Sequence, residues 1–139
     1  MQKPDETEID GWNLHRAATE NRADIAKSLI DSGVDIEARD TEGCTALHAA
    51  AWDNSLDVAR LIVELGADIE ARDHDAETPL HMAAWKNSIE VASFLVESGA
   101  NTDATDESGR TPLDRASANN YPYARSEDVE RLLAKLRSQ

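Results

Sequence analysis

The sequence predicts an all-α solenoid of four stacked units, each a short β-hairpin-like loop followed by a helix, a turn and a second helix. Three sets of residues recur at intervals of 33 positions along the 139-residue chain. A fixed period of this length is typical of repeat architectures, in which each unit buries its apolar face against its neighbours. The recurring residues are leucines (Leu14, Leu47, Leu80, Leu113), alanines (Ala17, Ala50, Ala83, Ala116) and glycines (Gly33, Gly66, Gly99).

The first helix of each unit is predicted from its start and stop signals. Thr78 followed by Pro79 is the clearest start, because a threonine hydroxyl caps free backbone N–H groups and proline at the first helical position gives up a donor that has no partner there. An asparagine marks each predicted stop, because asparagine tolerates the left-handed backbone of a tight turn. These residues are Asn21, Asn54, Asn87 and Asn120.

The second helix of each unit is predicted by apolar residues that share one helical face, such as Val58, Leu61 and Ile62 in the second unit. The recurring glycines then act as C-terminal caps. The chain next enters hairpins, whose tips we place at Asp40, Asp73 and Asp106.

One domain accounts for nearly the whole chain. We expect an acidic leader at residues 1–7 and a single domain at residues 8–139. The repeats of this domain are expected at about 8–39, 40–72, 73–105 and 106–137. The first and last repeats act as caps. In the last repeat, Leu113 is followed by the first apolar residue of the second helix, Val129, after 16 positions rather than 11. This difference predicts a five-residue insertion, which contains Tyr121 and Tyr123 and either covers the end of the core or forms a second contact site.

The motif around the recurring leucine resembles the ankyrin repeat family. Thr78-Pro79-Leu80-His81-Met82-Ala83 matches its T-P-L-H-x-A signature, and Thr45-Ala46-Leu47-His48-Ala49-Ala50 matches it nearly as well. The resemblance covers about residues 8–137. It implies that His15, His48 and His81 form hydrogen bonds that fix each hairpin to its first helix, and that they have no catalytic role.

Composition excludes several classes of function. The formal net charge of −14 opposes binding to nucleic acid, whose phosphates are recognised through Lys and Arg. The longest apolar stretch, residues 46–52, is far too short to cross a membrane. A lone cysteine, Cys44, cannot form an internal disulfide, and we expect it to be a surface residue. We predict an intracellular protein, in the cytoplasm, with the nucleus or a host cell as alternatives, and a monomer when free.

No pattern in the sequence indicates an enzyme. The chain has no phosphate-binding glycine loop, no nucleophile elbow and no Cys–His metal-ligand spacing. Histidines in successive repeats would lie about 10 Å apart, too far to share one zinc ion. We therefore predict no catalytic residue, no metal site and no cofactor.

The resemblance implies a binding module whose concave face, made of hairpin tips and first helices, meets a partner protein or peptide. Trp52 and Trp85 are 33 positions apart, and we expect them to stack as an aromatic ledge or else to pack sideways within the stack. The acidic rim around them predicts a basic segment as the partner. A self-associating scaffold and an inhibitory or effector subunit remain alternatives. The predicted contact residues are Arg39, Glu42, Trp52, Asp53, Arg72, His74, Asp75, Glu77, Trp85, Lys86, Glu107 and Arg110.

Overall fold

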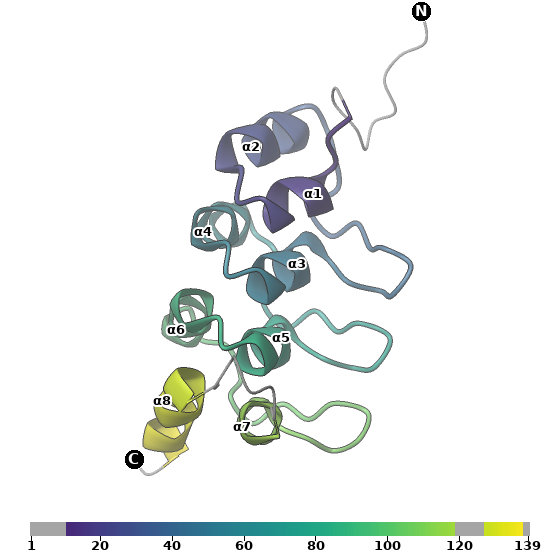
Figure 1. The fold of residues 1–139 in the computed structure, drawn as a ribbon. Coiled ribbons are helices and arrows are strands. Elements are labelled where there is room, and N and C mark those ends of the chain that lie inside the picture. The colour runs from purple at the N-terminus through teal and green to yellow at the C-terminus, as the bar shows by residue number, and fades with distance from the viewer. Residues whose placement is uncertain (1–10, 119–126, 138–139) are drawn as a thin grey trace, which may run out of the picture.

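A computed structural model describes residues 11–118 and 127–137 of the chain. Successive odd-numbered helices contact each other, as do successive even-numbered helices, so that two rows form with the loops projecting beside the odd row (Figure 1). Within the described residues the fold is all-helical, as predicted. Its helices are α1 (Leu14–Thr19), α2 (Ala23–Asp31), α3 (Ala46–Trp52), α4 (Leu56–Glu64), α5 (Pro79–Lys86), α6 (Ile89–Glu97), α7 (Pro112–Ser117) and α8 (Glu127–Arg137).

The core lies between the two rows of helices and is made of small and aliphatic side chains. Leu47 and Leu80 are each 1% exposed, and Ala50 and Ala83 are fully buried. Alanine at these positions lets neighbouring helices approach closely, which suits a chain with few aromatic residues. Leu113, in the last of the described repeats, is only half-buried.

Threonine side chains begin three of the first helices. Thr45, Thr78 and Thr111 each accept a hydrogen bond from the backbone of the third helical residue, as the start signal predicted. In the first repeat, Asn13 takes this role and its side chain accepts from the Arg16 N–H at 2.8 Å. A cap was not predicted there, because the Thr-Pro pair is missing.

The turns inside the repeats adopt the predicted left-handed backbone. Asn21, Asn54 and Asn87 have φ of 54°, 55° and 55°. Their side chains do more than tolerate this conformation. Each side-chain oxygen accepts a hydrogen bond from the third residue of the next repeat's second helix, as Asn54 does from the Val91 N–H at 3.1 Å. Every such asparagine therefore caps a helix of the following repeat.

The same kind of cap joins the third repeat to the fourth. Asn21 and Asn54 accept from residues 37 positions further along, Val58 and Val91. Asn87 accepts from Val129, which is 42 positions away. The predicted insertion itself, the Asn120 turn and the predicted leader at residues 1–7 lie outside the described residues.

Candidate partner-binding site

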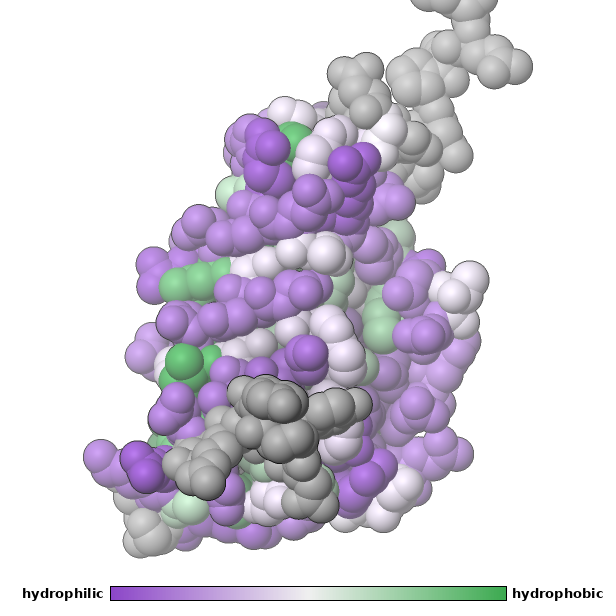
Figure 2. Space-filling view, in the orientation of Figure 1, coloured by the Kyte–Doolittle hydropathy of each residue, from purple (hydrophilic) through white to green (hydrophobic). Residues whose placement is uncertain are grey.

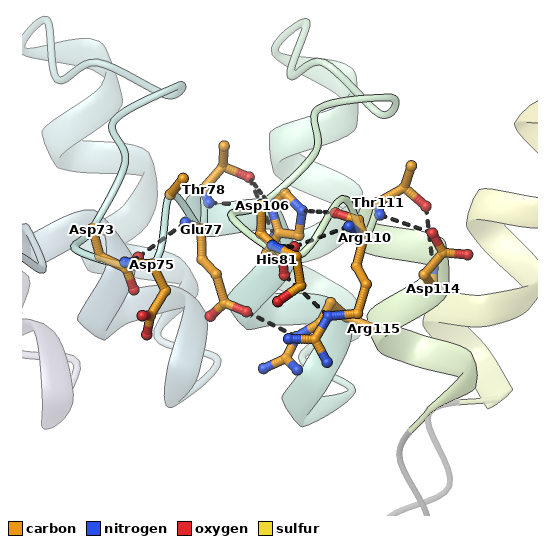
Figure 3. A network of polar contacts seen from close by, with 12 residues as sticks. Asp73, Asp75, Glu77, Thr78, His81, Asp106, Arg110, Thr111, Asp114 and Arg115 are labelled. Atoms are coloured by element: carbon orange, nitrogen blue, oxygen red, sulfur yellow. Dashed lines mark hydrogen bonds and ion pairs between the residues drawn. The ribbon is translucent and has the colours of Figure 1, made fainter.

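The loop tips are held by aspartates that were predicted only as turn positions. One side-chain oxygen of Asp73 accepts hydrogen bonds from the backbone N–H groups of Asp75 and Glu77, both at 2.9 Å (Figure 3). Asp40 and Asp106 form the same pair of bonds in their loops. Each tip is thus a defined turn that presents the following side chains in a fixed order.

The recurring histidines have the structural role that the resemblance implied. His48 accepts a hydrogen bond from the Thr45 N–H through Nδ1, at 3.1 Å, and its Nε2 lies 2.8 Å from the Glu77 carbonyl of the next repeat. This arrangement suits a neutral imidazole with its proton on Nε2. Burial accordingly lowers the pKa of His48. The equivalent Nε2 contacts of His15 and His81 are to the carbonyls of Cys44 and Arg110.

Two predicted contact residues, Arg39 and Arg72, prove to be part of the framework. Arg72 donates through Nη1 to the carbonyl of Ala76 in its own loop, at 2.8 Å, and to that of Thr105 in the next loop, at 2.7 Å. Arg39 bonds to Gly43 and Arg72 in the same way. Each arginine thus joins one loop to the next while its side chain stays exposed, and its role as a partner contact remains a prediction.

Glu77 was also misplaced on the exposed rim. Glu77 is only 7% exposed. Its side chain forms an ion pair with Arg115 of the next repeat, in which Arg115 Nε lies 2.9 Å from Glu77 Oε1 (Figure 3). The Arg115 guanidinium also lies 4.1 Å from the centroid of the Trp85 ring. Burial raises the pKa of Glu77, while Arg115 opposes that rise.

Cys44 is buried rather than a surface residue. It is 9% exposed, and its thiol lies 3.9 Å from an Asp73 oxygen of the next repeat. Burial, followed by the carboxylates around it, raises the pKa of the thiol to about 12. The thiol is therefore protonated and unreactive near neutral pH.

One hollow lies against α3 and the loop before it. Its volume is about 220 Å³. Trp52 is 41% exposed and forms one wall, while Asp53 and Glu42 add carboxylates. Burial raises the pKa of Asp53, and Lys86 opposes that rise. The remaining lining residues are Thr19, Asp40, Cys44, His48, Ala49 and Met82.

Lys86 and Arg110, two further predicted contacts, are held by side chains nearby. Lys86 places its Nζ 4.9 Å from the centroid of the Trp52 ring. Arg110 Nε lies 3.3 Å from a side-chain oxygen of Asp106, which is buried. A cation from the next repeat therefore faces Trp52, as Arg115 faces Trp85.

The remaining predicted contacts lie on the loops, and backbone hydrogen bonds join them. His74 donates its N–H to the Glu42 carbonyl at 3.1 Å, and Glu107 donates to the Asp75 carbonyl at 2.9 Å. These side chains are exposed. The loops thus form a continuous edge along the concave side.

Other site classes find no support in the described part of the chain. Within residues 11–118 and 127–137, no group of His, Cys, Asp and Glu side chains could hold a metal ion. Among the helices described, none combines the length and apolar character needed to span a bilayer.

A family model described as ankyrin repeats (3 copies) matches residues 2–73 and 70–138. The chain belongs to the ankyrin repeat family. Ankyrin repeats are generally protein–protein interaction modules, and proteins built from them are typically non-enzymatic. A comparison with curated proteins gave no match.

Sequence reasoning missed several residues of this ankyrin surface. Arg115 and Met82 occupy the same position of successive repeats, and their importance depends on what lies one repeat earlier. Asp40 was predicted only as a hairpin tip and Thr19 was not singled out, although both line the hollow. The available signal was the comparison of equivalent positions across repeats, which shows a charged residue replacing an apolar one.

Proposed function

We propose that this chain is a non-catalytic interaction module that binds a positively charged segment of a partner protein on its concave face. The observation that carries this proposal is the 220 Å³ hollow, where an exposed indole adjoins three carboxylates. Those carboxylates belong to Asp40, Glu42 and Asp53.

An indole beside carboxylates is suited to recognising a cationic side chain. Tryptophan offers a large contact area with little rotamer entropy to lose. A cation that lies on its ring gains further attraction from the π electrons, and carboxylates around the ring add direct pairing. The net charge of −14 also increases the rate at which positively charged partners arrive.

The exposed surface favours a polar interface over a hydrophobic one. Figure 2 shows a face of the molecule that is mostly hydrophilic, with hydrophobic residues scattered singly. Trp52 and Leu65 are the large hydrophobic residues that are clearly exposed in the described chain. Such a surface supports an interface built from a small number of anchored contacts.

Selection from a random peptide library displayed on phage tests the proposal without a known partner. Peptides selected on the wild-type protein should be rich in Arg and Lys. They should lose most of their binding to a Trp52→Ala variant, because that exposed side chain forms the wall of the hollow. Trp85→Ala is a less suitable probe, because the largely buried Arg115 lies 4.1 Å from its ring centroid, whereas the cation near Trp52, Lys86, is exposed and lies 4.9 Å away.

A charge-matched control separates this surface from the general acidity of the chain. Asp53→Lys and Glu64→Lys change the charge equally, but only Asp53 lines the hollow; Glu64 ends α4 in the second row. Selected peptides should bind Glu64→Lys almost as well as wild type and Asp53→Lys poorly. Equal binding to Trp52→Ala and to wild type would contradict the proposal.

A further inference from the structure

Arg115, an arginine of the fourth repeat, lies in a site made by residues of the third repeat. The guanidinium of Arg115 lies 4.1 Å from the Trp85 ring centroid and its Nε lies 2.9 Å from Glu77 Oε1. The Arg115 side chain is only 13% exposed. We call this arrangement of indole, carboxylate and loop the arginine seat. Figure 3 shows the Arg115 side chain directed from α7 toward Glu77 of the preceding repeat.

The hollow beside Trp52 is the equivalent position one repeat earlier. A shift of 33 residues takes Trp85 to Trp52 and Arg115 to Met82. Both Trp52 and Met82 line the hollow. Met82 is uncharged and 8% exposed, so within the described residues no arginine fills the equivalent position beside Trp52. The remaining space, about 220 Å³, equals the volume of roughly seven waters at ~30 Å³ each.

The hollow beside Trp52 differs from the arginine seat in its charged residues at two further positions. Glu77 of the first seat corresponds to Cys44, whose raised pKa of about 12 keeps the thiol neutral. The rim gains Asp53 at the position that corresponds to Lys86 in the following repeat. Asp40 and Glu42 also line the hollow, and they correspond to Asp73 and Asp75 one repeat later.

We propose that the hollow between Trp52 and Met82 binds the side chain of an arginine on a partner segment, in the manner in which Trp85 and Glu77 hold Arg115. This inference rests on the proposed function and names the side chain that the same surface recognises. The planar guanidinium lies on the indole and donates to the rim carboxylates, which a lysine ammonium cannot do with the same geometry.

Lys86 shares this neighbourhood and sets a limit on affinity. Its Nζ lies 4.9 Å from the Trp52 centroid, and its charge acts on Asp53. It does not line the hollow. A bound arginine thus meets one positive charge as well as three carboxylates, and the carboxylates outweigh it.

Short peptides of glycine and serine around one central residue test this directly. The central residue is arginine, lysine, citrulline or leucine, and the readout is the NMR signal of the Trp52 indole N–H during titration. The arginine peptide should give a saturable shift. Lysine and citrulline should bind about fivefold more weakly, since each loses either planarity or charge. Equal binding of arginine and citrulline, or tighter binding of leucine, overturns the proposal.

Two variants of the protein test whether the arginine of the peptide binds in the hollow between Trp52 and Met82. Met82→Arg should fill the seat from within, as Arg115 does one repeat later, and should remove the peptide-induced shift while circular dichroism shows an intact fold. If Met82→Arg fails to fold, Asp53→Lys carries the test, because Lys86 already occupies that position in the next repeat. Asp53→Lys should weaken arginine binding about fivefold or more, and Glu64→Lys should leave it unchanged.

The outcomes separate this inference from the proposed function. If peptides selected by display lose binding to Trp52→Ala but bind a folded Met82→Arg variant as tightly as wild type, the concave-face module stands and the arginine seat is wrong. An arginine peptide that binds Asp53→Lys as well as wild type also overturns the seat. Loss of binding in Trp52→Ala, Met82→Arg and Asp53→Lys, but not in Glu64→Lys, supports both.

Discussion

Arg115→Met is the perturbation that most sharply tests the arginine seat as a structural unit. The change places in the fourth repeat the residue that the third repeat already has, Met82, so it preserves apolar packing. It removes the cation from the Trp85 ring and leaves Glu77 without its ion pair. The Glu77 side chain is only 9% exposed, so water compensates for that loss only in part.

The expected loss in the free energy of unfolding is about 2–4 kcal/mol at pH 7. A desolvated cation–π contact contributes ~0.5–2 kcal/mol. Removing one partner of a buried ion pair costs ~3–5 kcal/mol, but Glu77 can limit this cost by taking up a proton. Protonation costs ~1.4 kcal/mol for each unit by which the pH exceeds its pKa, which burial has already raised.

Urea unfolding at pH 7 and pH 5 measures the loss and its origin. In the variant, the pKa of Glu77 rises further above its unfolded value, so the folded state binds more protons than the unfolded state between those two values. The loss relative to wild type should therefore shrink as the pH falls toward 5. In a Glu77→Gln background, Arg115→Met should cost at least ~1 kcal/mol less, because no buried charge is left unpaired. A loss below ~0.5 kcal/mol, or the same loss in both backgrounds, refutes the seat.

Three other residues give independent tests of the framework. Asn54→Gly keeps the left-handed turn but removes the cap on the Val91 N–H. It should lower the free energy of unfolding, measured in urea, by about 1 kcal/mol. Asn54→Ala should lower it by about 1 kcal/mol more, because alanine is strained in this backbone conformation. Ala76→Gly should raise stability by about 0.5 kcal/mol, because Ala76 has φ of 59°, and an unchanged melting temperature contradicts that strain. Burial lowers the pKa of His48 below 6.5, so the unfolded state binds the proton first and stability falls as pH drops through that region. His48→Gln should flatten this dependence, and an unaltered pH profile excludes His48 as its source.

The fold was predictable because one period governs the whole chain. The recurring leucines and alanines occupy equivalent positions, all of them buried except the half-buried Leu113, so a single alignment places the helices of all four repeats. Local signals agreed with that period. Thr78 and Pro79 begin a helix where the pattern requires one, and glycines with positive φ end the second helices.

The side-chain contacts between repeats were harder to predict, because their partners lie far apart in the sequence. Asn54 was expected to adopt a left-handed conformation, but its partner, the Val91 N–H, is 37 residues away. Arg72 was predicted only as a partner contact, and its hydrogen bond to the Thr105 carbonyl, 33 residues away, was not foreseen. Composition does not reveal such pairings, and only the stacked geometry brings the groups together.

The candidate site illustrates the same limit in its charged residues. Glu77 was predicted to be a contact residue of the acidic rim. The structure instead pairs it with Arg115, another residue that departs from the repeat pattern. When two such charged residues lie in contact, they neutralise each other and neither is free to bind a partner. The Trp52 hollow is distinguished because its counterpart to Arg115 is Met82, which carries no charge.

A crystal structure of the protein with a peptide selected by display is the most direct test of this account. We expect an arginine side chain of the peptide to lie against the Trp52 ring, beside Met82, with its guanidinium donating to a rim carboxylate such as Asp53. A peptide bound through the second helices, or one that places an apolar side chain in the hollow, would contradict the central claim.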